Sequence, residues 1–102
     1  MKIYISLPIT GHDIEQVEAR CIFTAAILQK QGYTPISPLE LDHRDPEDYE
    51  AVIGTDITAL LCCDAVYFCN GWETSKGCRL EYQAAKIYGK EIILEQQKGG
   101  TQ

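Results

Sequence analysis

Residues 64–93 read DAVYFCNGWETSKGCRLEYQAAKIYGKEII, and this stretch decides the fold. A short apolar run at residues 65–69 is followed by a loop that contains glycine and by a helical pattern that opens near Ser75. A second apolar run occupies residues 91–94. This order is typical of a strand, a loop, a helix and a second strand.

The length and composition favour one domain. The chain has 102 residues, of which 45% are hydrophobic and 24% charged, and a second domain would be too small to keep its own core. No apolar run approaches the roughly 20 residues that a membrane helix needs. The start, MKIYISLPITG, is too short and too β-branched for a signal peptide. We therefore expect a cytoplasmic protein with no membrane partner, one domain over residues 1–95, and a polar, disordered tail over residues 96–102.

The charge and the cysteines argue against two kinds of site. A formal net charge of −6 disfavours binding of a nucleic acid polymer through its phosphates. The five cysteines, at positions 21, 62, 63, 69 and 78, form no C-x-x-C pair and have no histidine at metal spacing. We expect no metal, and buried free thiols in a reducing compartment.

The rest of the chain repeats the alternation of strand and helix. Residues 2–6 form a β-branched apolar run, and a helical pattern extends from Asp13 to a cap at Gly32. Residues 33–36 predict a short strand, and the prolines in and after it favour the edge of a sheet. A second helical stripe covers residues 47–63. The charged segment 39–46 should be the most mobile, and its His43 is interpreted as a solvated side chain rather than a catalytic base.

This pattern predicts a small, doubly wound α/β fold of the flavodoxin or Rossmann type. Strands that alternate with helices form right-handed βαβ units, and hence a parallel sheet between two helical layers. Four strands give the order 2-1-3-4 in its simplest form. Ligands of such sheets bind at the carboxyl ends of the strands, so the loops after Ser6 and Cys69 should face each other across a crevice. The first of these loops offers Ile9, Thr10 and Gly11.

Two carboxylates occupy unusual positions in the predicted helices. Asp56 falls on the apolar stripe of its helix, where an unpaired charge costs several kcal/mol. It either lines a cavity or sits at the edge of the stripe and bonds a backbone amide. Glu81 has uncharged neighbours at i−4 and i+4, so it lacks the partner of an ordinary helical ion pair. We interpret both as functional residues.

The loop before the third helix offers further contacts. Ser75 is a predicted N-cap, and the amides of Lys76 and Gly77 behind it would favour an anion. Trp72 either stacks on a base or covers the loop. The segment GWETSKG lacks the order G-x-x-x-x-G-K-[ST], and no G-x-G-x-x-G follows the first strand, so neither a Walker-type ATPase nor ordinary dinucleotide binding is supported.

Four features together resemble a known group of enzymes. They are Tyr4 in the first strand, Asp56 on the helix before the third strand, Asp64 eight residues later, and the S-x5-E pattern from Ser75 to Glu81. This arrangement is similar to the nucleoside 2-deoxyribosyltransferase-like superfamily, which includes nucleoside-monophosphate N-glycosidases. The resemblance covers residues 2–94. The length and the phrase GWETSKG are most similar to a small, functionally uncharacterised branch of the type called domain of unknown function 4406.

The resemblance implies a role for each matching residue. Glu81 matches the nucleophile that attacks the anomeric carbon, and Tyr4 matches a residue that orients it. Asp56 matches the carboxylate that assists at the base or the sugar hydroxyls. Ser75 stands where monophosphate hydrolases carry a phosphate-binding serine. Physically, a helix N-terminus would keep Glu81 ionised, whereas an apolar stripe would raise the pKa of Asp56.

One departure keeps the substrate open. Phosphate-binding members carry a glycine-rich loop with an arginine after the first strand, and residues 7–11, LPITG, have neither. We expect an N-glycosidase or deoxyribosyltransferase that acts on a nucleoside or nucleoside 5′-monophosphate, without metal or organic cofactor. The alternative is a non-catalytic nucleotide-binding or sensing domain. Each helix needs one apolar stripe to face the sheet, and Phe23, Ile27 and Tyr82 are apolar residues in addition to these stripes. They predict a homodimer or a higher homo-oligomer.

Overall fold

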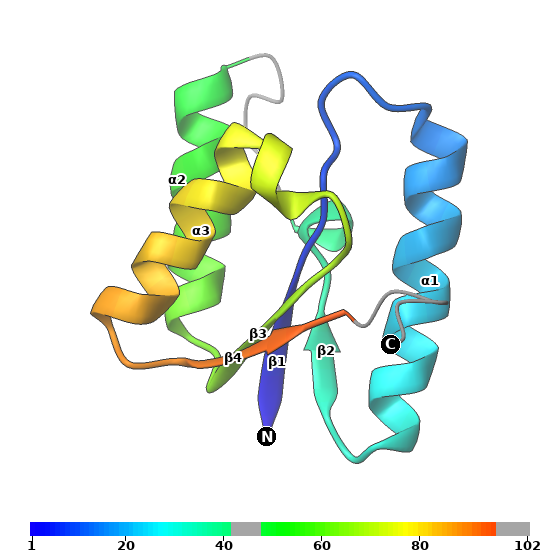
Figure 1. Cartoon of the computed structure of the whole chain (residues 1–102), viewed down its shortest axis with the longest axis vertical. Helices are drawn as coiled ribbons and strands as arrows, with labels where there is room; N and C mark the ends of the chain where they lie inside the picture. The colour runs from blue at the N-terminus through cyan, green and yellow to red at the C-terminus, as the bar shows by residue number, and fades with distance from the viewer. Residues whose placement is uncertain (42–47, 96–102) are drawn as a thin grey trace.

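The computed structural model describes residues 1–41 and 48–95 and contains four strands and three α-helices (Figure 1). The strands are β1 (Lys2–Ser6), β2 (Thr34–Ile36), β3 (Ala65–Phe68) and β4 (Glu91–Leu94). The helices are α1 (Ile14–Lys30), α2 (Tyr49–Leu61) and α3 (Lys76–Ile87), with short 3-10 turns at η1 (Pro38–Glu40) and η2 (Trp72–Thr74). The predicted His43 and the predicted tail over residues 96–102 lie outside the described residues.

The strands form one parallel sheet in the order β2-β1-β3-β4, which confirms the predicted fold class and topology. β1 is the central strand that pairs with both β2 and β3. β2 lies at one edge, where a proline is tolerated because one side of the strand needs no ladder hydrogen bond. Its Pro35 pairs with Ile3 of β1. The switch in strand order therefore falls beside β1, as the sequence predicts.

Local capping explains where the helices begin and end. Asp13 caps α1 by accepting a hydrogen bond from the amide of Glu15, and Asp48 caps α2 by accepting one from Ala51. Ser75 caps α3 through the amide of Cys78, as predicted. Gly32 follows α1 with φ +93°, a left-handed conformation that glycine adopts without a steric penalty. These caps place the start of both α2 and α3 at the carboxyl end of the sheet.

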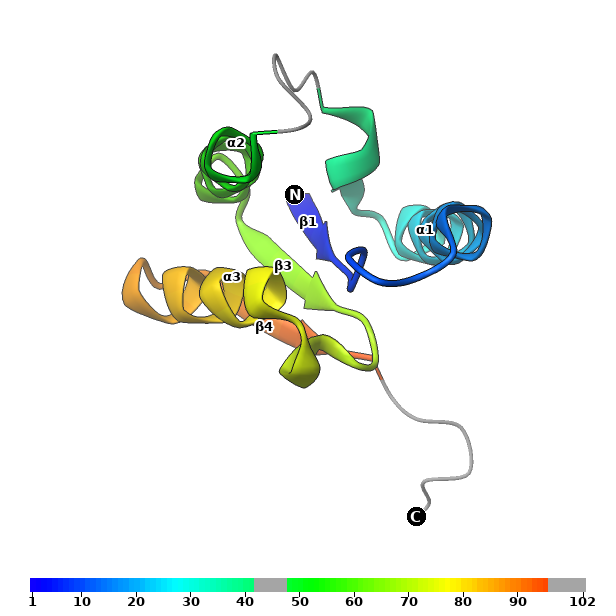
Figure 2. The ribbon, with the colours of Figure 1, turned by 90° about the horizontal axis from the view of Figure 1, so that it is seen from above.

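The helices cover the two faces of the sheet unequally (Figure 2). α1 packs against β1 and β2 on one face, whereas α2 and α3 lie on the opposite face. Alternate residues of β1 serve the two layers, because successive side chains of a strand point to opposite sides. Ile3 and Ile5 join the core under α1, and Tyr4 joins the core under α2 and α3.

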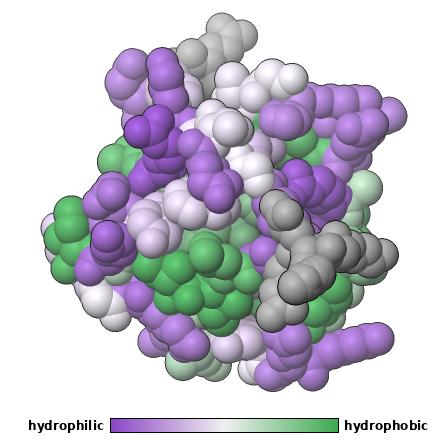
Figure 3. Space-filling model, in the orientation of Figure 1, coloured by the Kyte–Doolittle hydropathy of each residue, from purple (hydrophilic) through white to green (hydrophobic). Residues whose placement is uncertain are grey.

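Several large apolar side chains remain on the surface. In the orientation of Figure 1, an apolar patch lies over β4, whose Leu94 is 49% exposed (Figure 3). Phe23 of α1 is 68% exposed and Ile27 is 39% exposed. Tyr82 differs from the expectation, since its ring stacks on Trp72 with 4.6 Å between the ring centroids and is half-buried.

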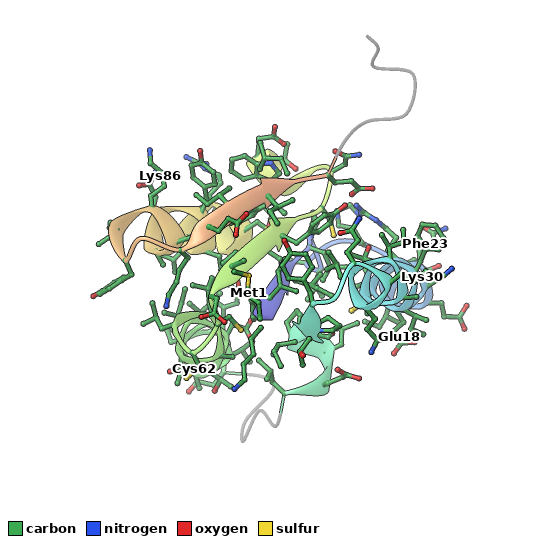
Figure 4. The ribbon with its side chains drawn as sticks, turned by 90° about the horizontal axis from the view of Figure 1, so that it is seen from below. Met1, Glu18, Phe23, Lys30, Cys62 and Lys86 are labelled. Atoms are coloured by element: carbon green, nitrogen blue, oxygen red, sulfur yellow. The ribbon has the colours of Figure 1, made fainter. Side chains whose placement is uncertain are left out.

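The cysteines follow the prediction with one exception. All five are free, and four of them are buried, but Cys62 is exposed. Cys62 lies directly after α2, on the outside of the molecule (Figure 4). α2 ends at Leu61, before the predicted end at residue 63, and Cys62 follows the exposed Thr58 by four residues, which places its thiol on the outward side of the helix. Among the described residues, no helix is long and apolar enough to cross a membrane.

Candidate active site

A cavity of about 340 Å³ opens at the carboxyl end of β1, between the first turns of α2 and α3. Its volume lies within the range of about 300–1,000 Å³ that is common for small-molecule sites. The wall combines residues that follow β1 and β2 with one face of each of the two helices. The lining residues are Tyr4, Leu7, Ile9, Thr10, Pro38, Tyr49, Val52, Ile53, Asp56, Ser75, Gly77, Cys78 and Glu81.

Glu81 is a buried polar group of this wall, and each of its carboxylate oxygens accepts a hydrogen bond. Its side chain is only 5% exposed. The Tyr4 hydroxyl donates a hydrogen bond to Glu81 Oε2 at 2.8 Å, and the Ser6 hydroxyl donates one to Oε1 at 2.6 Å. Both donors come from β1, two residues apart and therefore on the same face of the strand. Each carboxylate oxygen thus has one fixed donor and keeps a second lone-pair direction for another contact.

The charge state of Glu81 differs from the sequence expectation. Burial raises the pKa of its carboxyl group to about 7, the hydrogen bonds from Ser6 and Tyr4 lower it, and the charge of Asp56 raises it further. The expected effect of the helix N-terminus fails for a positional reason. Lys76 is the first residue of α3, so Glu81 lies in the second turn, whereas the field of a helix end fades within the first turn. Desolvation therefore dominates.

Asp56 faces the same cavity from α2. It is 7% exposed, so the apolar stripe does bury it, as the sequence suggests. Its charge raises the pKa of both Glu81 and Tyr4. Burial is the larger cause for Tyr4, whose pKa rises well above its ordinary value, so the hydroxyl stays protonated and remains a donor. The geometry brings the two predicted carboxylates to one cavity.

Ser75 and Gly77 form the start of α3 at the mouth of the cavity. A Cβ at Gly77 would lie 3.5 Å from Ile53 Cδ1 and 4.0 Å from the Tyr49 hydroxyl, so the glycine lets α2 and α3 approach closely. A second hollow of about 390 Å³ adjoins the cavity and shares Thr10, Tyr49, Ser75 and Gly77 with it. His12 and Lys76 line this hollow but not the first cavity.

Two predicted contact residues lie elsewhere. Trp72 is absent from the cavity wall, because its ring packs against Tyr82 and lies 5.3 Å from the Phe68 ring, centroid to centroid. Its ring lines a separate hollow together with Tyr82, and its stacking on a base stays a prediction. Gly11 also lies outside the wall, with φ +84° in the turn before α1. The predicted Tyr4, Ile9, Thr10, Ser75 and Gly77 all line the cavity.

The sequence analysis missed three polar or sulfur-bearing residues of the site, namely Tyr49 and Cys78 in the cavity wall and Ser6, which bonds Glu81, and also the apolar lining residues Leu7, Pro38, Val52 and Ile53. Ser6 could have been found from its spacing, since it follows Tyr4 by two residues and must share its face of the strand. Tyr49 opens α2, one turn before Ile53 and two before Asp56. Burial raises the pKa of the Cys78 thiol, and hydrogen bonds with Ser6 and Ser75 lower it.

The donor set does not suit a metal ion. Among the described residues, no group of three or more His, Cys, Asp or Glu side chains converges in a geometry that could hold one. The described cavity wall contains no lysine or arginine either. What the wall offers is two carboxylates, several hydroxyl groups and an apolar surface.

Comparisons with known proteins place this fold. The family model described as a domain of unknown function, DUF4406, matches residues 1–94. The structure is similar to a 2-deoxyribosyltransferase from Bacillus psychrosaccharolyticus, with a TM-score of 0.70, 24% identity, and coverage of 92% of this chain and 71% of that one. It is also similar to the CMP N-glycosidase BcmB of Clostridium botulinum, with a TM-score of 0.57, 19% identity, and coverage of 92% and 70%. None of the curated protein sequences matches the chain. At these identities the likeness establishes a shared fold.

Proposed function

The chain belongs to the DUF4406 family, a domain of unknown function, and we propose that it is an N-glycosidase that acts on a nucleoside or nucleoside 5′-monophosphate. The observation that carries this proposal is the buried Glu81, whose two oxygens accept hydrogen bonds from β1 at a cavity that Asp56 also lines. The two solved structures with this fold, a deoxyribosyltransferase and a CMP N-glycosidase, support the same class of chemistry.

The proposed reaction has two steps. In the first, a Glu81 oxygen attacks C1′ of the sugar, the bond from C1′ to the base nitrogen breaks, and its electron pair leaves with the base, which takes a proton from Asp56 or from water. In the second, water attacks C1′ and gives a proton to the group that protonated the base, while the bond from C1′ to Glu81 breaks and releases the free sugar. A second base in place of water would give transfer. Because burial raises the pKa of Glu81 to about 7, both its ionised and its protonated form are present near neutral pH.

The adjoining hollow supports a substrate with an anionic end. The cavity itself carries two carboxylates, whereas His12 and Lys76 lie on the far side of Tyr49 and Ser75. A 5′-phosphate placed there would meet the amides at the start of α3 without approaching Glu81. This arrangement could replace the arginine that the loop after β1 lacks. Lys76→Ala should therefore raise the KM for 5′-monophosphates about tenfold and leave nucleosides unaffected.

The test of the main proposal is release of free base. A panel of nucleosides and 5′-monophosphates is incubated with wild-type protein, with Glu81→Gln and with the control Thr24→Val, and products are separated by chromatography. Thr24 belongs to α1, which covers the opposite face of the sheet. We expect Glu81→Gln to lose at least about 10³-fold in kcat and the control to retain wild-type activity. Full turnover in Glu81→Gln contradicts the mechanism, and thermal stabilisation by a nucleotide without base release supports the binding-domain alternative.

The proposal includes self-association through the outer face of α1. Ile22 is 71% exposed and Phe23 is 68% exposed, which is costly for side chains of this size in water. Sedimentation velocity at micromolar concentration should give a dimer or larger species, and Phe23→Lys should shift it towards monomer. A monomer in the wild-type protein would contradict this part of the proposal.

A further inference from the structure

Ser6 has no role in the sequence analysis, yet it makes the shortest hydrogen bond to Glu81. It ends β1 and is 0% exposed. Its hydroxyl lies 2.6 Å from Glu81 Oε1, within the range of about 2.5–2.7 Å that is typical of a hydroxyl bound to an ionised carboxylate. We propose that Ser6 is a positioning residue that fixes the orientation of the Glu81 carboxylate and favours its ionised form. Its catalytic consequence rests on the proposed function, but its effect on Glu81 does not.

The Ser6 hydroxyl proton takes part in one hydrogen bond, the one to Glu81. A serine hydroxyl has a single proton, and donating it to Glu81 leaves the oxygen only as an acceptor. The Cys78 thiol, one turn before Glu81 on α3, also lies near Ser6, and burial raises its pKa, so it stays neutral and competes only weakly for the Ser6 proton. The short bond to Glu81 Oε1 therefore fixes the direction of the Ser6 hydroxyl.

The charges around Glu81 make the two hydroxyl donors decisive. β1 presents Tyr4 and Ser6, α2 presents Asp56, and α3 itself presents Cys78. Asp56 opposes ionisation of Glu81, and no described residue of the cavity wall is a lysine or an arginine. Among the described residues, the charged form of Glu81 is thus stabilised by the neutral donors Tyr4 and Ser6. Losing one of two such donors should have a large effect.

The first measurement follows the titration of Glu81 directly and needs no substrate. Protein labelled with ¹³C at glutamate carboxyl groups is titrated by NMR, and the Glu81 resonance is identified by its loss in Glu81→Gln. In Ser6→Ala the midpoint should rise by about one to two pH units, because a hydrogen bond to a charged group contributes the corresponding tenfold to hundredfold in the ionisation equilibrium. Ser6→Cys keeps a weak donor of similar size, so its Glu81 midpoint should lie between those of the wild-type protein and Ser6→Ala.

Thr24→Val is the matched control. Thr24 is also buried and polar, at 8% exposure, and its hydroxyl contacts Cys69 under α1. The Glu81 midpoint should not move in this variant. An unchanged midpoint in Ser6→Ala or in the folded Ser6→Cys overturns the proposal, and so does an equal shift in Thr24→Val, because the shift would then follow from general loosening.

The second measurement concerns base release. Ser6→Ala should move the pH profile of kcat towards alkaline pH and lower kcat at its plateau, with little change in KM, because the nucleophile is less often ionised and less well oriented. A shifted titration without any base release from the wild-type protein would support the role of Ser6 and contradict the proposed function. Base release with an unshifted titration would contradict the role of Ser6 alone.

Discussion

The two faces of the sheet bury polar groups in different ways. Under α1 the buried polar contacts are between neutral groups, with Cys21 Sγ and Ser37 Oγ 2.8 Å apart and Thr24 Oγ1 and Cys69 Sγ 4.0 Å apart. Under α2 and α3 the sheet buries Glu81 beside Tyr4 and Ser6. Neutral groups are satisfied by one neighbour, whereas a buried carboxylate needs several donors and still carries a raised pKa. The first face contributes stability, and the second gives up part of it to hold a buried carboxylate.

The largest effect should show that the two hydrophobic layers are equivalent. Leu28 of α1 is 1% exposed, and Leu60 of α2 is 0% exposed. Replacing either with alanine should lower the free energy of unfolding by about 2–5 kcal/mol, through lost burial and a new cavity. Chemical denaturation measures both. A difference of more than about 2 kcal/mol between them would mean that one layer dominates the stability of the fold.

The next effect should distinguish the two faces of the sheet by the pH dependence of the free energy of unfolding. The pKa of Glu81 rises from 4.5 to about 7 on folding, so the folded protein binds this proton more tightly than the unfolded chain. The free energy of unfolding therefore falls as the pH rises from about 4.5 to about 7. Glu81→Gln removes this loss and should be more stable than wild type by up to about 3 kcal/mol at pH 8, with no gain below pH 4.5. Chemical denaturation of both proteins at pH 8 and below pH 4.5 tests this prediction. A Glu81→Gln variant less stable than wild type at pH 8 would show that the ionised carboxylate is well compensated.

A smaller effect should come from the second donor. Tyr4→Phe removes the hydroxyl that donates to Glu81 Oε2. It should destabilise the protein by about 2 kcal/mol at pH 8 and about 1 kcal/mol at pH 5, since a hydrogen bond to an ionised group is the stronger. Tyr33→Phe is the control, because Tyr33 packs against the core under α1. An equal loss in the free energy of unfolding of Tyr4→Phe at pH 8 and pH 5 would contradict this prediction.

The smallest effect concerns the thiols, which both layers protect. Cys62 is exposed and the other four are buried. A thiol reagent should label one cysteine per folded chain quickly and all five after unfolding. Cys62→Ser should abolish the fast phase and change the free energy of unfolding by less than about 0.5 kcal/mol. Two fast-reacting thiols in the native protein would indicate that one layer opens locally.

The sequence predicts the fold well and the site less completely. Strand order follows from patterns that local physics enforces, such as the buried run of β3 and the cap at Ser75. Asp56 and Glu81 are visible because a carboxylate on an apolar or small-residue face is conspicuous. Ser6 is not, since a serine in a strand has many uses and only the tertiary packing gives it Glu81 as a partner. The pKa of Glu81 depends on burial depth, which helix position alone does not reveal.

The placement of both Glu81 donors on β1 has a kinetic consequence. β1 is paired on both sides, by β2 and β3, so its amides should exchange with solvent only when the whole domain opens. Fraying of an edge strand such as β4 leaves Tyr4 and Ser6 in place. Tyr4 and Ser6 should therefore keep their positions until the whole domain opens. Amide exchange at these two residues and global unfolding should follow a single time course, and the rate of one should report the other.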